Sequence, residues 1–197
     1  MTSSLEDILE RHRSGDPSAI DLLCEFAMEK LLGLCNRLLP RHGGVARWDR
    51  PSDIRQDAAL RLFQSLKDVK PESERHLLNL TAMQVQRVLL DKAREHGRKG
   101  KGLGHLVDRH AQGEDNPIEV VAQRHTGPGT LERWGQFHAC ANSLSELMRD
   151  VFRMRWYLGL TENEMAGVLG VSRSTVQRAW KSAVDEINAK LGRRPGE

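Results

Sequence analysis

Residues 161–181 read TENEMAGVLGVSRSTVQRAWK, and this stretch decides the fold of the C-terminal part of the chain. Its apolar residues recur at the spacing expected of two short helices that share a small core. Gly170 stands between them, where a turn needs a residue that tolerates positive φ. Thr161 and Glu164 have the spacing of a capping box, and Ser172 is a favourable N-cap for the second helix. The pattern predicts a helix-turn-helix.

The second helix of this motif carries side chains that can donate hydrogen bonds to phosphates or base edges. The alternative is an ordinary helical hairpin with a polar face, but the apolar spacing, the turn glycine and both caps together favour DNA binding. We expect the first four polar residues at base edges, the last two at phosphates, and Trp180 in the core. In chain order, the six candidates are Arg173, Ser174, Thr175, Gln177, Arg178 and Lys181.

Composition points to small helical cores and a polyanionic partner. The chain has 197 residues, of which 39% are hydrophobic and 5% aromatic, so two small cores are more plausible than one large core. The formal net charge is only +3, but residues 85–101 hold six basic and two acidic side chains. Residues 172–197 form a second basic segment, with six basic and three acidic side chains. Two basic segments predict two separate contacts with a polyanion.

Several classes of protein are disfavoured by what the sequence lacks. It has no run of 18 apolar residues and no secretory signal at its N-terminus, which predicts a cytoplasmic protein without a membrane span. Cys24 and Cys35 lie too far apart on one predicted helix to form a disulfide, and Cys140 reads as a third reduced core residue.

Enzyme chemistry and metal binding are also disfavoured. There is no phosphate-binding loop, nucleophile elbow or paired-carboxylate arrangement, so we expect no enzyme activity and no cofactor. The cluster of His105, His110, His125, His138 and Cys140 matches no zinc-ligand spacing, so we expect no metal site.

The remaining sequence predicts helices almost throughout, interrupted by one glycine- and proline-rich segment. We therefore predict an all-α fold of two small helical domains, 1–100 and 130–197, joined by a flexible linker over 101–129. The predicted helices run from Ser3 or Ser4 to near Gly15, from Asp16-Pro17 to Pro40, over 53–66 with Ser52 as cap, over 76–96 with Gly97 as stop, over 130–143 and over 145–157, with a short helical possibility at 118–123 in the linker.

This layout resembles that of a bacterial sigma factor of the extracytoplasmic-function (ECF) type, in which a sigma-2 and a sigma-4 domain are joined by a linker. Three blocks carry the resemblance: SDIRQDAALRLF at 52–63, RVLLDKAR at 87–94, and the helix-turn-helix. The second block is similar to the form found in ECF sigma factors of planctomycete type. Their order and spacing are more specific than any block alone.

The resemblance implies a role for each block. The first would bind the clamp of core RNA polymerase through Asp53, Gln56, Asp57, Leu60 and Phe63, although a solvated helix face is the simpler reading of such charges. The third would read the −35 promoter element. The second block and the residues around it would contact DNA at the −10 region, and the candidates there are Asn79, Gln84, Gln86, Arg87, Arg94, Arg98 and Lys99.

The chain departs from the family pattern at the base-capture segment. The aromatic residues usual there are replaced by His76, Leu77 and Leu78, and Met83 stands where the family often has an asparagine. Asn79, Gln84 and Gln86 can therefore equally be surface amides with no role in capturing a flipped base.

The sequence predicts a promoter-specificity subunit whose partners are core RNA polymerase (clamp and flap) and promoter DNA, with an anti-sigma factor as a further partner that the resemblance allows. The alternative is a helix-turn-helix regulator that binds DNA without joining polymerase. A third possibility is a sigma-like protein held as a regulatory partner and controlled by phosphorylation. The block at 52–63 favours the first, since a simple repressor has no use for it.

Overall fold

The computed structural model describes residues 4–37, 51–98 and 130–192, and every regular element within these ranges is a helix. The prediction of an all-α fold is therefore confirmed for this part of the chain. The helices are α1 (Leu5–Arg13), α2 (Ser18–Arg37), α3 (Pro51–Asp68), α4 (Glu74–Arg98), α6 (Thr130–Asn142), α7 (Glu146–Leu158), α8 (Glu162–Leu169) and α9 (Arg173–Gly192).

Local capping fixes the helix-turn-helix as the sequence predicts. The Thr161 hydroxyl accepts a hydrogen bond from the Glu164 amide at 3.3 Å, and the Glu164 carboxylate accepts one from the Thr161 amide at 2.8 Å. Gly170 has φ 64°, in the left-handed region that ends α8. The Ser172 hydroxyl accepts a hydrogen bond from the Thr175 amide at 3.2 Å and so caps α9.

Helices α3 and α4 both extend beyond their predicted boundaries. α3 already includes Pro51 and Ser52, because a proline is tolerated in the first turn, where its missing N–H has no helical partner. α4 begins at Glu74 after Ser73, whose hydroxyl accepts a hydrogen bond from the His76 amide at 3.2 Å, and it continues through Gly97 to Arg98. A single glycine lowers helix stability without ending the helix. The short helix considered at 118–123 lies outside the described residues.

The apolar residues form two cores. The smaller joins α1, α2, α3 and α4 through residues such as Leu9, Leu23, Leu62 and Leu77. The larger joins α6, α7, α8 and α9 to the other faces of α3 and α4 through residues that include Phe152. Two cores were predicted, but the larger one combines residues from both predicted domains. The boundaries at 100 and 130 remain a prediction, since the segment between them is not described.

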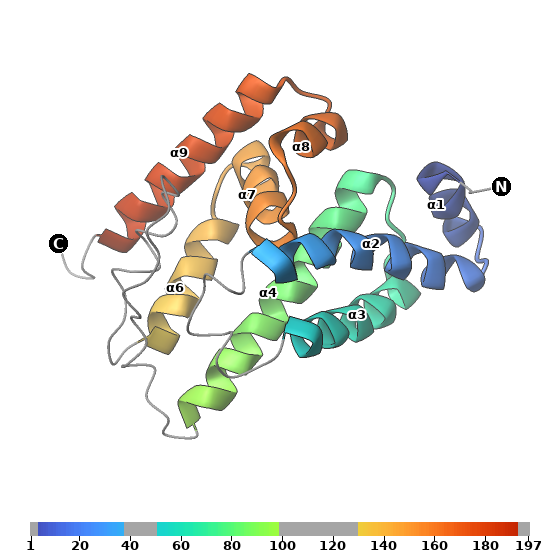
Figure 1. The fold of residues 1–197 in the computed structure, drawn as a ribbon, viewed down its shortest axis with the longest axis horizontal. Coiled ribbons are helices and arrows are strands. Elements are labelled where there is room, and N and C mark those ends of the chain that lie inside the picture. The colour runs from blue at the N-terminus through green and yellow to red at the C-terminus, as the bar shows by residue number, and fades with distance from the viewer. Residues whose placement is uncertain (1–3, 38–50, 99–129, 193–197) are drawn as a thin grey trace.

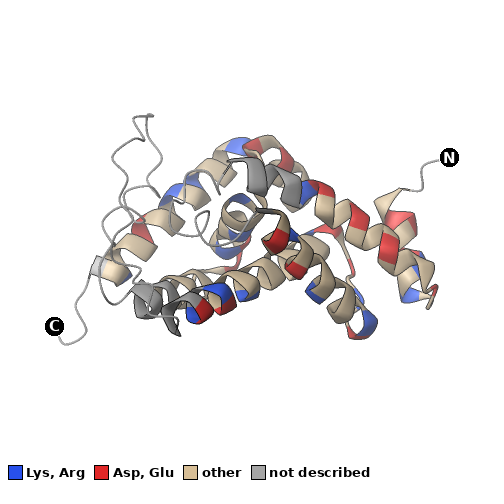
Figure 2. Ribbon diagram, turned by 60° about the horizontal axis from the view of Figure 1, so that its bottom comes forward, with Lys and Arg blue, Asp and Glu red and all other residues tan. Residues whose placement is uncertain are grey.

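Helix α7 lies at the centre of this arrangement. It packs against α4, α2 and α9, so the C-terminal helices rest on the N-terminal ones (Figure 1). Acidic and basic residues are interspersed over the helices in Figure 2, with no helix of a single charge sign standing out. Within the described ranges, no helix combines the length and apolarity needed to cross a bilayer.

Candidate polymerase- and DNA-binding surfaces

The predicted polymerase-binding residues of α3 share one outward side of the helix. Ile54, Ala58 and Leu62 face the interior and are buried. Asp53 and Gln56 are exposed, whereas Asp57 and Phe63 are half-buried. The side of α3 away from the cores is thus open, and it carries both charge and apolar surface.

Leu60 is the most distinctive residue of this surface. It is 58% exposed, and it is the one large hydrophobic side chain exposed in the described part of the chain. Nearby, Asp57 forms an ion pair with Lys92 of α4 at 3.2 Å, and Lys67 Nζ lies 4.9 Å from the centre of the Phe63 ring. Asp53 accepts a hydrogen bond from the Ser52 hydroxyl, and it forms no ion pair within the described ranges. Its carboxylate is therefore more available to another molecule than that of Asp57, which pairs with Lys92.

The predicted −10 residues of α4 fall on different faces. Arg87 and Arg94 are exposed, and Arg94 also pairs with Asp91 at 3.1 Å. Arg98 belongs to α4, but its side chain and the whole of Lys99 lie outside what the structure describes. Of the seven candidates, only these two arginines are therefore seen open to a nucleic acid.

Gln84 was predicted to lie on the surface, either as a DNA contact or as a solvated amide, but the structure buries it. It is 2% exposed and donates a hydrogen bond to the Ser65 hydroxyl of α3 at 3.0 Å, while accepting one from Arg87 at 3.3 Å. The physical reason is its place on the side of α4 that packs against α3, where a buried amide must find partners. Its hydrogen bonds thus link α4 to α3 and fix Arg87 within α4.

Asn79 and Gln86 lie on the side of α4 that carries Leu78 and Ala82, which belong to the larger core. Gln86 is 6% exposed. Asn79 is half-buried and donates a hydrogen bond to the Arg75 carbonyl at 3.1 Å, but its Oδ1 is buried and finds no hydrogen-bond partner within the described ranges. In this arrangement both amides are covered rather than presented to DNA.

Polar contacts hold α7 and α8 to the N-terminal helices. The Arg75 guanidinium of α4 donates from Nε to Asp150 of α7 at 2.6 Å and reaches Glu146 at the same distance. The Asp150 hydrogen bond raises the pKa of Arg75. Lys30 of α2 lies 3.4 Å from Glu164 of α8. These links connect residues more than 70 positions apart.

The predicted recognition helix is open along its N-terminal half. Arg173, Ser174, Gln177, Arg178 and Lys181 are all exposed. Thr175 is half-buried and shares a hydrogen bond of 2.9 Å with the Ser172 hydroxyl. Trp180 is 7% exposed and lies in the core, as predicted.

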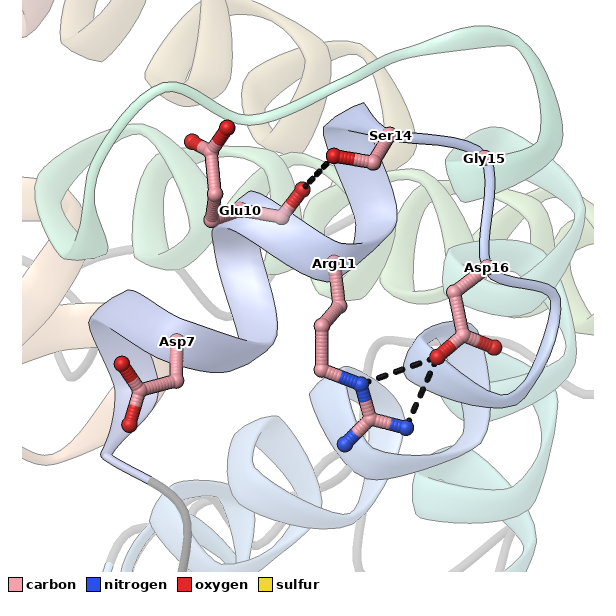
Figure 3. A pocket seen from close by; sticks show the side chains of 6 residues that line it. All are labelled: Asp7, Glu10, Arg11, Ser14, Gly15 and Asp16. Carbon is pink, nitrogen blue, oxygen red and sulfur yellow. Dashed lines mark hydrogen bonds and ion pairs between the residues drawn. The ribbon is translucent and has the colours of Figure 1, made fainter.

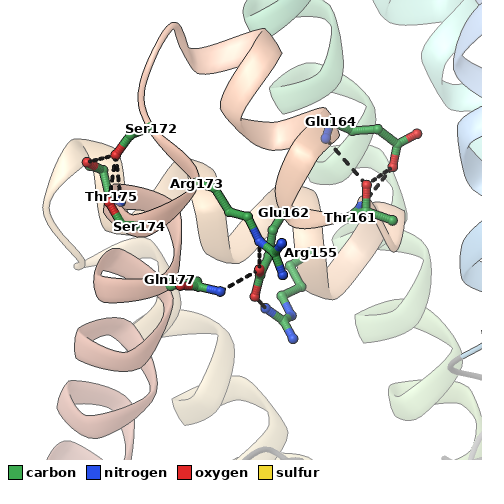
Figure 4. Close-up of polar contacts among 9 residues, drawn as sticks. All are labelled: Arg155, Thr161, Glu162, Glu164, Ser172, Arg173, Ser174, Thr175 and Gln177. Carbon is green, nitrogen blue, oxygen red and sulfur yellow. Dashed lines mark hydrogen bonds and ion pairs between the residues drawn. The ribbon is translucent and has the colours of Figure 1, made fainter.

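A carboxylate that the sequence did not single out organises this surface. Glu162, the first residue of α8, accepts hydrogen bonds from Arg173 Nε at 2.7 Å and from Gln177 Nε2 at 2.8 Å (Figure 4). Its other oxygen lies 3.4 Å from the Arg155 guanidinium of α7. The hydrogen bond from Arg173, with help from that of Gln177, holds the pKa of Glu162 below its usual value. An acid in a first helical turn gives no signal in the sequence that would reveal such cross-helix contacts.

A shallow hollow lies at the turn between α1 and α2 (Figure 3). Asp7, Glu10 and Asp16 line it, and Arg11 crosses it to donate to Asp16 at 2.9 Å. Asp16 also accepts from the Ser18 amide at 2.9 Å, at the start of α2. The polar side chains there close the turn on themselves, which gives residues before Asp16 a structural role.

No group of three or more potential metal ligands occurs in the ranges that the structure covers. His105, His110 and His125 fall outside those ranges. His138 is buried in α6, where its Nδ1 contacts the Tyr157 hydroxyl of α7. Burial lowers the pKa of His138 to about 3, so its imidazole is neutral at physiological pH.

An all-α chain with an exposed helix-turn-helix has the architecture of a DNA-binding protein, and the outward side of α3 is a second open surface. The chain matches the ECF sigma factor family model over residues 2–192 and belongs to that family. No curated protein and no solved structure matches it. The match identifies an RNA polymerase sigma factor, and it leaves the planctomycete subgroup and the absence of enzyme activity as predictions.

Proposed function

We propose that this sigma factor binds core RNA polymerase through the outward side of α3 and directs it to promoters by reading the −35 element with α9. The observation that carries the proposal is that both surfaces are open in one molecule. Asp53, Gln56 and Leu60 are exposed on α3, while Arg173 and Gln177 are exposed on α9. The family match supports this use of α3, and the exposed Leu60 lies about two helical turns from Asp53 on the same side of the helix.

Helix α4 supplies the proposed contact with DNA near the −10 element. Arg87 and Arg94 are exposed and suited to phosphate contacts, which add salt-dependent affinity and little sequence information. Asn79 and Gln86 can contact bases only when the C-terminal helices have moved off α4, because both are covered in the present arrangement. Gln84 is left out of this proposal because its described partners lie within the α3–α4 pair.

The test of polymerase binding compares two charge reversals of equal size. Asp53→Arg changes the proposed surface, whereas Glu25→Arg changes an exposed acid on α2 that the proposal does not use. In titrations of labelled protein with bacterial core RNA polymerase, we expect Asp53→Arg and Leu60→Ser each to weaken binding at least tenfold, on the order seen for interface hot spots. Glu25→Arg should bind like the unmodified chain.

Asp57 is avoided in this test because its pair with Lys92 links α3 to α4, and its loss could disturb packing instead of docking. Equal polymerase affinity for all four proteins would refute the α3 assignment. Binding to double-stranded DNA without any association with polymerase would instead indicate a helix-turn-helix regulator.

A further inference from the structure

The carboxylate of Glu162 is shared by three helices at the proposed DNA-reading surface. Arg173 and Gln177 lie one turn apart on α9, and both donate to the same oxygen, Oε2. Arg155 of α7 approaches the other oxygen, Oε1, at 3.4 Å. Figure 4 shows these side chains converging on Glu162 from either side.

We propose that Glu162 is a positioning residue that sets which groups of Arg173 and Gln177 face the DNA and thereby determines base preference at the −35 element. The inference rests on the proposed function of α9. A carboxylate only accepts hydrogen bonds, so it selects the donor edge of each partner and leaves the remaining edge outward.

The geometry of the guanidinium gives this selection a chemical consequence. Arg173 uses Nε for Glu162, so its two terminal amino groups remain as the pair that can donate in parallel. Two parallel donors match the O6 and N7 acceptors of guanine in the major groove. The structure therefore favours guanine as the base that Arg173 reads.

Gln177 is oriented in the same way. Its Nε2 donates to Glu162, which leaves the carbonyl oxygen and the second amide hydrogen available. This combination matches adenine, which presents a donor at N6 and an acceptor at N7. Without Glu162, the amide could turn over and exchange its donor and acceptor.

Glu162 is itself held in place. The Arg155 guanidinium carbon lies 4.6 Å from the centre of the Trp180 ring, and Trp180 is buried in the core. Arg155 is thus fixed by a cation–π contact before it reaches Glu162. The Glu162 side chain is 22% exposed, against 63% for Arg173, so the acceptor is the more rigidly placed partner. Ordering the arginine before it meets DNA reduces the rotamer entropy lost on binding.

The experiment measures base preference in the full chain bound to core polymerase. Holoenzymes with unmodified protein, Glu162→Ala, Glu162→Gln and Asn163→Ala select from double-stranded DNA with randomised −35 positions, and the bound DNA is sequenced. Asn163 is the matched control, because it is exposed, adjacent to Glu162 and makes no hydrogen bond to this network within the described ranges. Thermal unfolding of each variant shows whether the fold is retained.

We expect Glu162→Ala to lower the preference for the best base about tenfold at the positions read by Arg173 and Gln177, since a bidentate contact discriminates on that order. Glu162→Gln should be intermediate, because its amide oxygen still accepts one hydrogen bond. Asn163→Ala should leave the preference unchanged. In an Arg173→Ala, Gln177→Ala background, removing Glu162 should have no further effect on base preference.

The outcomes separate the two levels of the argument. If the unmodified holoenzyme shows no base preference at these positions, the proposed function of α9 fails. If it shows a preference that Glu162→Ala keeps in full, the positioning role fails while the proposed function stands. If Glu162→Ala only tightens binding to every sequence alike, Glu162 acts as a competitor of phosphate for Arg173, and the positioning role is again overturned.

Discussion

Replacing Arg75 by alanine should reduce the free energy of unfolding by about 2 kcal/mol. The Asp150 side chain is only 4% exposed, and Arg75 is the cation that contacts it in the described ranges. Removing one partner of a fully buried ion pair costs about 3–5 kcal/mol, because it leaves a buried charge without compensation. The Arg75 side chain is 40% exposed, so water can partly replace it, and the expected loss is correspondingly smaller.

The measurement is urea unfolding of the full chain, followed by circular dichroism. The same arginine also contacts Glu146, whose side chain is 72% exposed, so Glu146→Ala is a matched control with an expected effect below about 0.5 kcal/mol. A double-mutant cycle of Arg75→Ala with Asp150→Asn should show a coupling of about 1–2 kcal/mol. Equal effects of Arg75→Ala and Glu146→Ala, with no coupling to Asp150, would show that the α4–α7 contact does not depend on this pair.

Three further predictions concern the C-terminal helices. Burial lowers the pKa of His138 to about 3 in the folded chain, so as the pH falls below 6.5 the unfolded chain binds a proton that the folded chain does not. The free energy of unfolding should therefore be unaffected by His138 above pH 6.5 and fall by about 2 kcal/mol by pH 5. Unfolding titrations of His138→Gln should lack this pH dependence. Gly170→Ala should cost about 1–2 kcal/mol because φ is 64°, whereas Gly167→Ala, with open space at its Cβ, should be neutral or stabilising; similar losses in both would contradict the turn argument. Lys181→Ala should weaken DNA binding equally for all sequences and lower the slope of affinity against salt by about one, and an unchanged slope would exclude a phosphate contact.

The elements that could be predicted from sequence are those with local signals. The helix-turn-helix depends on Thr161, Gly170 and Ser172, each of which acts on a backbone within three residues of itself. The buried side of α3 follows from helical spacing at Ile54 and Ala58. Such contacts need no knowledge of the rest of the chain, so a single sequence contains them.

The contacts that escaped prediction join distant parts of the sequence. Arg75 and Asp150 are 75 residues apart, and neither has a local pattern that distinguishes it from a solvated charge. Gln84 resembles a surface amide until Ser65 of α3 is placed beside it. Glu162 required the crossing of α8 and α9 to bring Arg173 into reach. Polar residues with long-range partners are therefore the part of this site that only a structure reveals.

Helix α4 sets a constraint on any account of promoter binding by this chain. The side that carries Asn79 and Gln86 also carries Leu78 and Ala82, and the larger core covers it. The same side cannot contact α7 and DNA bases at once, so either these two amides do not read the −10 element or the C-terminal helices leave α4 when they do. Departure would expose the Asn79 Oδ1, which is buried without a hydrogen-bond partner within the described ranges. Arg75→Ala distinguishes the two accounts, since weakening the α4–α7 contact should increase −10 binding only if departure is required.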